Sequence, residues 1–522
     1  MRKVKSKVLK ELDSNTTYDA CTFYLKEDKY SIQKSTFKNC SFRSSVTFTD
    51  VSDCRFENCG FSEKFRLDLS SQKLQKIPDY VFEMAELQEL CCKHNDIDVV
   101  PPEISQLKKL TVLELGFNKI TSLPLQISKL KNLKNLSLSG NGLNTFPLEV
   151  LQIENLEVLS LSHNHIDSIP QNIDQLHLQS LNLQYNRFES FPLSLQNLRH
   201  LKKLYLSNNE MSELPSEIGK LQNLEMLYLS ENRISYLPEE MQQLQKLIAL
   251  DLRRNQLSSF PIATSHLPNL KKYDLSRNKI KQLPQQLQLP KLRSLELFDN
   301  EVKDISVILN ELINLQELGL GMNKLSTLSD QIGNLRQLRF LDLSRNKLRK
   351  IPAKIGQLRL LQTLELQNNK LRELPPQVGQ LQHLKKLELQ HNKLNELPSE
   401  IGQLQSLEVL DAKNNNLQML PSSIGKLMHL DRLELEKNSL CELPPEIGKM
   451  QNLRILRLDD NLIKELPDSI GYLSNLGLFT LRRNQIQKLP ESITMLHKLQ
   501  YLSLQENPIR EYPDAIRSII NL

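Results

Sequence analysis

The sequence predicts an α/β protein built from stacked coils, with a shorter and different set of coils near its amino terminus. Two internal periods support this prediction: one of 23 residues from residue 64 onward, and one of 19 residues over residues 16–63. A chain of 522 residues would otherwise suggest about three or four domains. We therefore expect a basic segment over residues 1–15, a cap over residues 16–63 and one repeat array over residues 64–522.

The first 15 residues are rich in lysine. Val4, Val8 and Leu12 stand four residues apart, a spacing that places them on one face of a helix. The sequence thus predicts a short terminal helix that docks or frays, because one short apolar stripe is marginal by itself. The alternative interpretation is contact with an anionic membrane surface.

The segment over residues 16–63 repeats aromatic and cysteine positions every 19 residues. The three columns are Cys21, Cys40 and Cys59; Tyr18, Phe37 and Phe56; and Phe23, Phe42 and Phe61. Three coils at strand spacing would stack like residues upon each other, and the pattern resembles pentapeptide-type β-solenoids. We interpret this segment as a cap over the open edge of the first repeat.

The cysteine column has two interpretations, a metal or redox site and a column of small buried residues. Seven cysteines is an odd count, and no histidine stands at ligand spacing, so reduced core thiols are favoured. Cys91 and Cys92 are adjacent, and alternation along a strand points them to opposite faces. Cys92 falls in a leucine position and is expected in the core, whereas Cys91 is expected on the concave side of the sheet, reactive if exposed.

Each 23-residue repeat predicts one short strand followed by a turn. Leu113 and Leu115 share one face of the strand, whereas Glu114 lies on the other. An asparagine follows at Asn118, and its amide can both donate to and accept from backbone groups that water cannot reach. We call this position the repeat asparagine. It recurs from Asn95 to Asn507, and Gln72 precedes the series, which gives twenty repeats.

Proline stands six residues after the repeat asparagine in eighteen of the twenty repeats. Its fixed φ suits a segment that does not donate to a sheet, so the outer side is not expected to be another central strand. The two exceptions are Ser306 and Ser329, which stand at this position in two consecutive repeats. Such a local lapse indicates a place where curvature changes or a partner inserts.

The pattern LxxLxLxxNxLxxLPxxIxxLxx resembles the leucine-rich repeat family over residues 64–522. This variant is similar to the intracellular class found in Ras-pathway scaffolds, polarity scaffolds and many bacterial proteins. The resemblance implies a curved horseshoe, with a parallel sheet on the concave side and short helical turns on the convex side. It also implies a non-catalytic protein-binding scaffold, with a small GTPase, a phosphatase or a kinase-pathway component as the partner class.

Composition and motifs exclude several other functions. A net charge of +6 on 522 residues disfavours nucleic acid as a partner. The sequence shows neither an apolar stretch of membrane-spanning length nor a secretory signal, and it lacks the Cys-rich caps of extracellular relatives, so a cytoplasmic location is expected. HExxH, Walker A and GxSxG motifs are missing. We therefore predict no enzyme activity, no catalytic residue, no metal and no cofactor.

Two surfaces on the strand side are the candidate partner-binding sites. In the first half, aromatic and sulfur side chains gather at Phe117, Tyr185, Tyr205, Met226 and Tyr228, with His163 and His165 nearby. Tyrosine is common among the anchors of protein interfaces. Tyr205 and Tyr228 stand one period apart, which favours one contiguous patch over scattered surface aromatics.

In the second half, an acidic residue stands four positions before the repeat asparagine in eight of nine consecutive repeats. This acidic row comprises Asp251, Asp274, Glu296, Asp342, Glu365, Glu388, Asp411 and Glu434, with Gly319 as the exception. Further candidate contacts are Arg254, Arg277, Arg345, Phe298 and Met322, and a lysine row follows the asparagines at Lys279, Lys324, Lys347, Lys370 and Lys393. The rows form either a charged binding groove or a product of repeat duplication, in which they screen each other across the sheet.

The chain stops at Leu522, which would be the opening residue of another repeat. Ile516, Ile519, Ile520 and Leu522 are thus expected near the last core edge, where the tail folds over or a second copy associates weakly. Two functional alternatives to a stand-alone scaffold stay open. One is the recognition region of a larger signalling enzyme or ubiquitin ligase, and the other is a bacterial host-directed effector.

Overall fold

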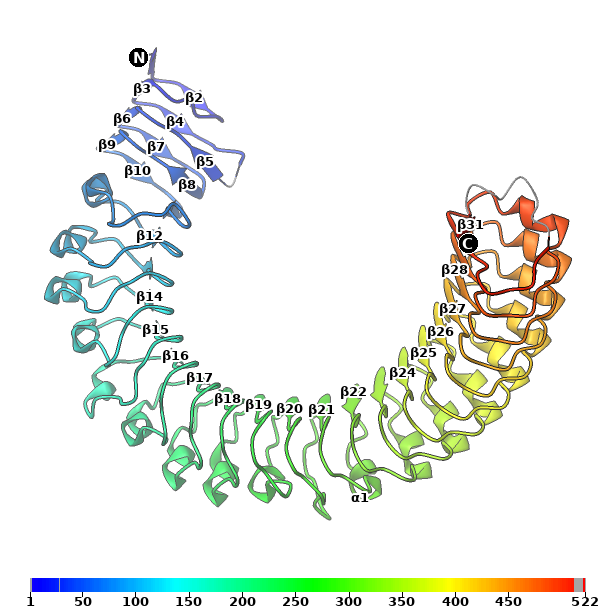
Figure 1. Ribbon diagram of the computed structural model, residues 1–522. Coiled ribbons are helices and arrows are strands. Elements are labelled where there is room, and N and C mark those ends of the chain that lie inside the picture. The colour runs from blue at the N-terminus through cyan, green and yellow to red at the C-terminus, as the bar shows by residue number, and fades with distance from the viewer. Residues whose placement is uncertain (1, 28, 511–519, 522) are drawn as a thin grey trace. The chain divides into compact units, whose positions relative to one another are not determined.

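The computed structural model describes residues 2–27, 29–510 and 520–521. The chain divides into two compact units, Met1–Leu250 and Asp251–Leu522. Each unit is a stack of coils, and in the repeats short parallel strands form one face and helical turns the other (Figure 1). The predicted solenoid with a parallel sheet and short helical turns is therefore confirmed within each unit.

The first unit opens with coils that have three strand faces. One face has strands β1 (Arg2–Lys5), β3 (Thr16–Asp19), β6 (Thr36–Lys38) and β9 (Arg55–Glu57). The second has β2 (Val8–Leu9), β4 (Thr22–Phe23), β7 (Ser41–Phe42) and β10 (Gly60–Phe61). The third has β5 (Lys29–Ser31), β8 (Val46–Asp50) and β11 (Phe65–Asp68).

The predicted amino-terminal helix is wrong. Residues 2–9 instead form strands β1 and β2, which pair in parallel with β3 and β4. An isolated short helix gains only its own hydrogen bonds, whereas a strand on an open coil edge also satisfies the edge of its neighbour. These residues thus add a coil to the predicted stack.

The predicted aromatic columns are stacked in the interior of these coils. Phe42 lies between Phe23 and Phe61, with ring centroids 4.7 and 4.6 Å away. The thiols of Cys40 and Cys59 are buried and donate to backbone carbonyls of the preceding coil. Strand β11 pairs on one side with β8 and on the other with the first full repeat, so the coils cover the edge of the array.

The repeats continue the third face as one strand each. In the first unit the strands are β12 (Glu89–Cys91), β13 (Val112–Glu114), β14 (Asn135–Ser137), β15 (Val158–Ser160), β16 (Ser180–Asn182), β17 (Lys203–Tyr205) and β18 (Met226–Tyr228), and β19 (Ala249–Asp251) stands at the division. In the second they are β20 (Lys272–Asp274), β21 (Ser294–Glu296), β22 (Glu317–Gly319), β23 (Phe340–Asp342), β24 (Thr363–Glu365), β25 (Lys386–Glu388), β26 (Val409–Asp411), β27 (Arg432–Glu434), β28 (Ile455–Arg457), β29 (Leu478–Thr480), β30 (Tyr501–Ser503) and β31 (Ile520–Asn521). Equivalent residues pair in register, as Leu341 does with Leu364.

The other side of the stacks consists of 3-10 turns. They are η1 (Asp79–Glu83), η2 (Pro102–Gln106), η3 (Leu125–Lys129), η4 (Leu148–Gln152), η5 (Ile173–Gln175), η6 (Leu193–Asn197), η7 (Ser216–Lys220) and η8 (Glu239–Gln243) in the first unit. In the second they are η9 (Ile262–Thr264), η10 (Asp330–Asn334), η11 (Ala353–Gln357), η12 (Pro376–Gln380), η13 (Ser399–Gln403), η14 (Ser422–Lys426), η15 (Pro445–Lys449), η16 (Asp468–Tyr472) and η17 (Glu491–Met495). In the described part of the chain, no helix is long and apolar enough to span a bilayer.

The proline position stands directly before many of these turns, and the outer side is not another central strand, as predicted. Pro352 precedes η11 with a φ of −72°. Where serine replaces proline, side chains take over: Ser329 Oγ accepts a hydrogen bond from the Gln331 N–H, and Asp304 accepts from both the backbone and the hydroxyl of Ser306. A short α-helix, α1 (Ser306–Leu309), begins at the first of these serines, Ser306. The lapse in the sequence therefore marks a real change of local structure.

Leucines and repeat asparagines hold neighbouring coils together. Asn346 is 7% exposed, and its amide nitrogen donates to Leu320, Leu343 and Ser344 carbonyls at 2.9, 3.1 and 3.0 Å. Its Oδ1 accepts from the Leu325 N–H at 2.9 Å. The predicted role of the asparagine is confirmed, because its side chain bonds its own turn and the preceding repeat.

At the carboxyl end, β31 pairs in parallel with β30. Of the predicted edge residues, Ile520 lies on β31, whereas Ile516, Ile519 and Leu522 lie outside the described residues. Weak self-association through this edge stays a prediction.

Candidate functional site

The concave sheet face of the first unit carries a stacked tyrosine pair. Tyr205 and Tyr228 pair in register on β17 and β18, and their rings are parallel within 2° with centroids 4.9 Å apart. Met226 lies two residues before Tyr228 on the same strand, with its sulfur 4.0 Å from the tyrosine hydroxyl. All three side chains are partly exposed. The predicted contact between Tyr205 and Tyr228 is therefore present in the structure.

Phe117 and Tyr185 do not lie on strands. Each immediately precedes a repeat asparagine and has left-handed backbone, with φ of +57° and +53°. The same conformation occurs at this position in repeat after repeat, almost always without glycine. The position is unusual for bulky residues, and we did not infer it from the sequence. It moves these two side chains to the edge of the sheet, past the ends of the strands.

An aromatic stripe runs along this edge. Phe117 stacks on His94 at 4.6 Å, and His163 stacks on Tyr185 at 4.0 Å. Gly140 fills the position between Phe117 and His163, and a Cβ atom there would lie 2.5 Å from the phenylalanine ring. The missing side chain lets Phe117 reach across the repeat to within 5.9 Å of His163. His94 is a site residue that sequence reasoning missed, although it occupies the same repeat position.

In the second unit, most candidate partner-binding residues outside the acidic row lie at the corresponding edge of the sheet. Arg254, Arg277, Met322 and Arg345 all have left-handed backbone and precede a repeat asparagine. The three arginines are exposed, whereas Met322 is half-buried. Phe298 lies two residues before its asparagine and is also half-buried. These side chains flank the acidic row without belonging to its strands.

The acidic row lies on the strands of the sheet, as predicted. Its members end successive strands and pair in register, for example Glu365 with Glu388. The aspartates also have a local structural role, because Asp274 and Asp342 each accept a hydrogen bond from the N–H two residues later, both at 2.8 Å. Part of the row is thus explained by turn formation.

Among the described residues, no ion pair joins the acidic row to the lysine row, so the structure does not decide between the two interpretations of these rows. The acids pair instead with bases on the sheet itself: Lys386 Nζ lies 2.5 Å from Glu388 and 3.7 Å from Glu365, and Arg432 lies 3.4 Å from Glu434. In the lysine row, Lys324 pairs at 2.6 Å with Glu301, the residue after the preceding repeat asparagine. The lysines lie beyond the strand ends, which separates them from the acids.

Burial and stacking make several acids hard to ionise. Burial, followed by repulsion from Asp274, Glu317 and Asp342, raises the pKa of Glu296 to about 7. Burial is also the main cause that raises the pKa of Asp411 to about 6. By contrast, Cys91 is 3% exposed and burial raises the pKa of its thiol, so this cysteine lacks the exposed, activated state that reactivity requires.

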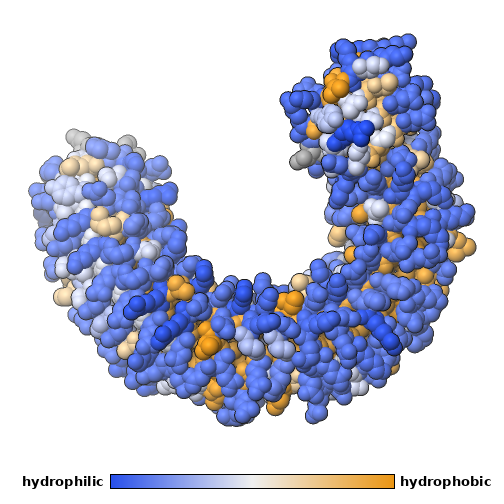
Figure 2. Space-filling view, turned by 180° about the vertical axis from the view of Figure 1, so that it is seen from behind, coloured by the Kyte–Doolittle hydropathy of each residue, from blue (hydrophilic) through white to orange (hydrophobic). Residues whose placement is uncertain are grey.

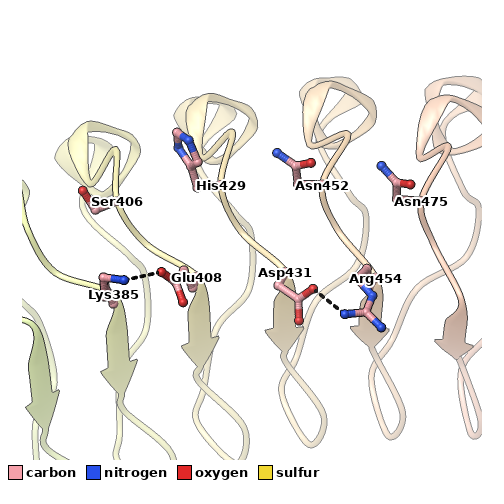
Figure 3. Close-up of a pocket in the computed structure, with 8 residues that line it drawn as sticks. All are labelled: Lys385, Ser406, Glu408, His429, Asp431, Asn452, Arg454 and Asn475. Carbon is pink, nitrogen blue, oxygen red and sulfur yellow. Dashed lines mark hydrogen bonds and ion pairs between the residues drawn. The ribbon is translucent and has the colours of Figure 1, made fainter. Parts of the chain in front are cut away.

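A groove of the second unit is part of the architecture of the repeats. It has a volume of about 620 Å³ and runs along the side of the coils between the turns and the strands (Figure 3). Ion pairs join Lys385 to Glu408 at 2.8 Å and Asp431 to Arg454 at 3.5 Å. His429 Nδ1 lies 2.7 Å from the Gln405 carbonyl. A similar groove of about 600 Å³ lies at equivalent positions of the first unit, lined by His177 and His200 among others.

Polar groups that line the groove of the second unit are engaged in bonds between repeats. Ser406 Oγ donates to the Gln382 carbonyl at 2.8 Å, so this hydroxyl, like the His429 imidazole, bonds the preceding repeat. Within residues 2–27, 29–510 and 520–521, no cluster of three or more His, Cys, Asp or Glu side chains could hold a metal ion. Figure 2 shows a largely hydrophilic face with small hydrophobic areas.

Family comparison matches most of the chain. The leucine-rich repeat region model matches residues 177–320, 291–392, 377–457 and 445–522, and a leucine rich repeat model matches residues 85–143 and 131–188. The chain belongs to the leucine-rich repeat family. Domains of this family are generally non-catalytic binding scaffolds for proteins or peptides.

Solved structures of other leucine-rich repeat proteins are similar to this one. A leucine-rich repeat protein of Leptospira interrogans is 31% identical, with 87% of this chain and 95% of that chain covered and a TM-score of 0.48. The Arabidopsis receptor kinase HAESA ectodomain, solved with a peptide hormone ligand, is 27% identical, with 84% and 82% covered and a TM-score of 0.63. A TDR receptor is 25% identical, with 87% and 90% covered and a TM-score of 0.68. The search of curated proteins gave no match.

Proposed function

We propose that this protein is a non-catalytic interaction scaffold that binds a folded protein partner on its concave sheet face. The stacked pair of Tyr205 and Tyr228 is the observation that carries this proposal. Two parallel rings on neighbouring strands form a rigid apolar surface with hydroxyl groups that can also bond a partner. Such rigid aromatic side chains lose little conformational freedom on binding and commonly anchor interfaces.

The surroundings of the pair suit an interface. Met226 adds an adaptable apolar side chain beside the rings, and the stripe from His94 to Tyr185 extends the aromatic area along the same unit. The ligand-bound structure of the HAESA ectodomain gives an example of a similar repeat domain that holds a peptide. This likeness supports binding as the function without naming the partner.

The partner class and the location belong to the same proposal. Resemblance to intracellular scaffolds favours a cytoplasmic protein that serves GTPase, phosphatase or kinase signalling. The two alternatives, a bacterial effector and a region of a larger signalling enzyme or ubiquitin ligase, stay open. A host-directed role for a bacterial protein of this kind stays a prediction.

The test is a binding measurement with a partner captured from the native cell. We expect the double change Tyr205→Ala and Tyr228→Ala to weaken binding by more than about 2 kcal/mol, because it removes the central anchor. The matched control is Tyr236→Ala with Tyr472→Ala, two tyrosines that are 54% and 58% exposed elsewhere on the chain. Equal affinities for the native protein and the Tyr205 and Tyr228 variant, at unchanged melting temperature, would remove this surface from the proposal.

A further inference from the structure

The concave face over β24–β27 has an excess of hydrogen-bond acceptors. Gln367 Oε1, Gln390 Oε1 and Glu436 Oε2 are buried and receive no hydrogen bond from the protein. All three residues stand two positions before a repeat asparagine, so they form one column beside the acidic row. Buried acceptors without donors are rare and unfavourable. Their recurrence at one repeat position indicates a property of this face.

The orientation of the Gln367 amide follows from its neighbour. Gln367 Nε2 donates to Glu365 Oε2 at 3.3 Å, so the amide oxygen must point away from that carboxylate. Turning the amide around would place its oxygen against a negative charge. The unpartnered oxygen is therefore a consequence of the acidic row.

Glu436 is the most deeply buried acid of this face. This residue is 5% exposed, and its Oε1 lies 3.8 Å from Arg457 and 4.0 Å from Lys413, too far for a normal hydrogen bond. Both it and Glu434 raise the pKa of the Asp411 carboxyl, although burial is the larger cause. Arg457 Nε is itself unpartnered, and this arginine ends the acidic row at β28.

The acids of this face outnumber the bases. The strand-side positions of the four repeats carry five acids and three bases. The acids are Glu365, Glu388, Asp411, Glu434 and Glu436, and the bases are Lys386, Lys413 and Arg432. Among the described residues Asp411 has no ion pair, and its Oδ1 accepts only the backbone N–H of Lys413, at 3.0 Å. This local acidity contrasts with the net charge of +6 of the whole chain.

We propose that the concave face from Glu365 to Glu436 binds arginine side chains presented by the protein partner. The proposal rests on the proposed function and adds the chemistry of the partner. A guanidinium group has five N–H donors in one plane, so it can bond a carboxylate and a neighbouring amide oxygen together. A lysine ammonium also carries a positive charge, but its donors do not lie in one plane, so it does not match this arrangement of acceptors. Phosphate groups of nucleic acids would be repelled.

The test uses fluorescein-labelled hexa-arginine and hexa-lysine peptides and the full-length protein, with fluorescence anisotropy as the measurement. A basic peptide should be repelled by a chain of net charge +6, so binding requires a local acidic face. We expect hexa-arginine to bind at least about five-fold more tightly than hexa-lysine. Equal affinities for the two peptides would overturn the arginine assignment.

Two triple variants locate the site. Glu388→Gln, Asp411→Asn and Glu436→Gln together should weaken hexa-arginine binding at least about ten-fold. The control triple Glu373→Gln, Glu396→Gln and Glu442→Gln removes the same charge from exposed positions after the repeat asparagines of the same unit, and it should change affinity less than about two-fold. Equal losses in the two triples would show general charge attraction and overturn the proposal.

Folding and the proposed function are checked separately. Removing stacked acids should not lower the melting temperature, and the single change Asp411→Asn gives a milder variant whose affinity should fall at least about three-fold. The tyrosine variant should keep its affinity for hexa-arginine, because Tyr205 and Tyr228 belong to the other unit. Loss of peptide binding in the tyrosine variant would contradict this site, whereas indifference of the partner to those tyrosines would contradict only the proposed tyrosine surface.

Discussion

Glu296 lies over a residue without a side chain. A Cβ atom on Gly319 would stand 1.8 Å from Glu296 Oε2, so the carboxylate occupies the space that a side chain would take on the next strand. Asp342 lies in the same way against Gly321, whose added Cβ would meet Asp342 Oδ2 at 2.3 Å. The glycine in the acidic row therefore does not interrupt it; it brings Glu296 towards Asp342.

This position predicts a pH-dependent stability. The folded pKa of Glu296 is raised to about 7 from 4.5, so between these values the folded chain holds a proton that the unfolded chain has lost. Stability should therefore rise as pH falls from about 7 to about 4.5, and the penalty is fully present above pH 7. We expect Glu296→Gln to stabilise the protein at pH 8 by roughly 1 to 3 kcal/mol.

Thermal melts at pH 8 and pH 4.5 provide the measurement. The gain from Glu296→Gln should be present at the higher pH and nearly absent at the lower one. Glu373→Gln, at an exposed position outside the sheet, is the control and should change neither melt appreciably. A gain of the same size at both pH values would show that charge on Glu296 is not the cause.

Single residues also show where sequence reasoning stops. The spacing of Tyr205 and Tyr228 was enough to predict their contact, because equivalent strand residues pair in register. Phe117 and Tyr185 were placed near the strands, but a left-handed backbone turns them to the sheet edge. That conformation has no reliable signal in side chains such as Phe, His, Tyr and Arg, since glycine is the residue that normally reveals it.

At the scale of elements, two ladders of side chains join neighbouring coils. The buried ladder consists of the repeat asparagines. The exposed ladder stands nine residues before them, where Asn314 Nδ2 donates to the Pro290 carbonyl at 2.9 Å and Asn452 Nδ2 donates to the Met428 carbonyl at 2.7 Å. The two ladders differ in burial and in the number of bonds, so they should differ in their contribution to stability.

We expect Asn346→Ala to destabilise the protein by about 2 to 5 kcal/mol. The change leaves several buried backbone groups without partners, and each such group costs roughly 1 to 3 kcal/mol. Asn314→Ala removes one exposed bond and should cost less than about 1 kcal/mol. Urea unfolding of the two variants measures the difference. If Asn314→Ala were the more damaging, the buried ladder would not be the main connection between coils.

The sequence predicted those elements that depend on one residue type at a fixed position of the repeat. Leucine alternation predicted the strands, proline predicted that the outer side is not another central strand, and asparagine predicted the bonds to buried backbone groups. The terminal strands β1 and β2 were missed because their pairing depends on an open edge that no local pattern records. The sequence pattern did not identify the ion-pair partners of the acidic row. The spacing of residues along the chain does not reveal that Lys386 lies on the same sheet face as Glu365 and Glu388.

At the scale of the whole molecule, each repeat is supported mainly by the repeats next to it. Strand β23 pairs with β22 and β24, and the bonds of Asn346 reach only the preceding repeat. Stability in such an array is approximately a sum of repeat and neighbour terms, and local opening need not spread through the chain. A destabilising change in one repeat should consequently increase local opening in that repeat and in the repeats next to it.

Leu343→Ala tests this locality. Leu343 is fully buried at 0% exposure, so the change leaves a cavity that costs about 2 to 5 kcal/mol. We expect hydrogen exchange, measured by mass spectrometry, to speed up in β22, β23 and β24 and to stay unchanged in β13 of the first unit. Glu365→Ala, at a partly exposed position of the next repeat, should leave exchange in all four strands nearly unchanged. Faster exchange in β13 as well as β23 would mean that the two units unfold together, and the nearest-neighbour account of this protein would then be wrong.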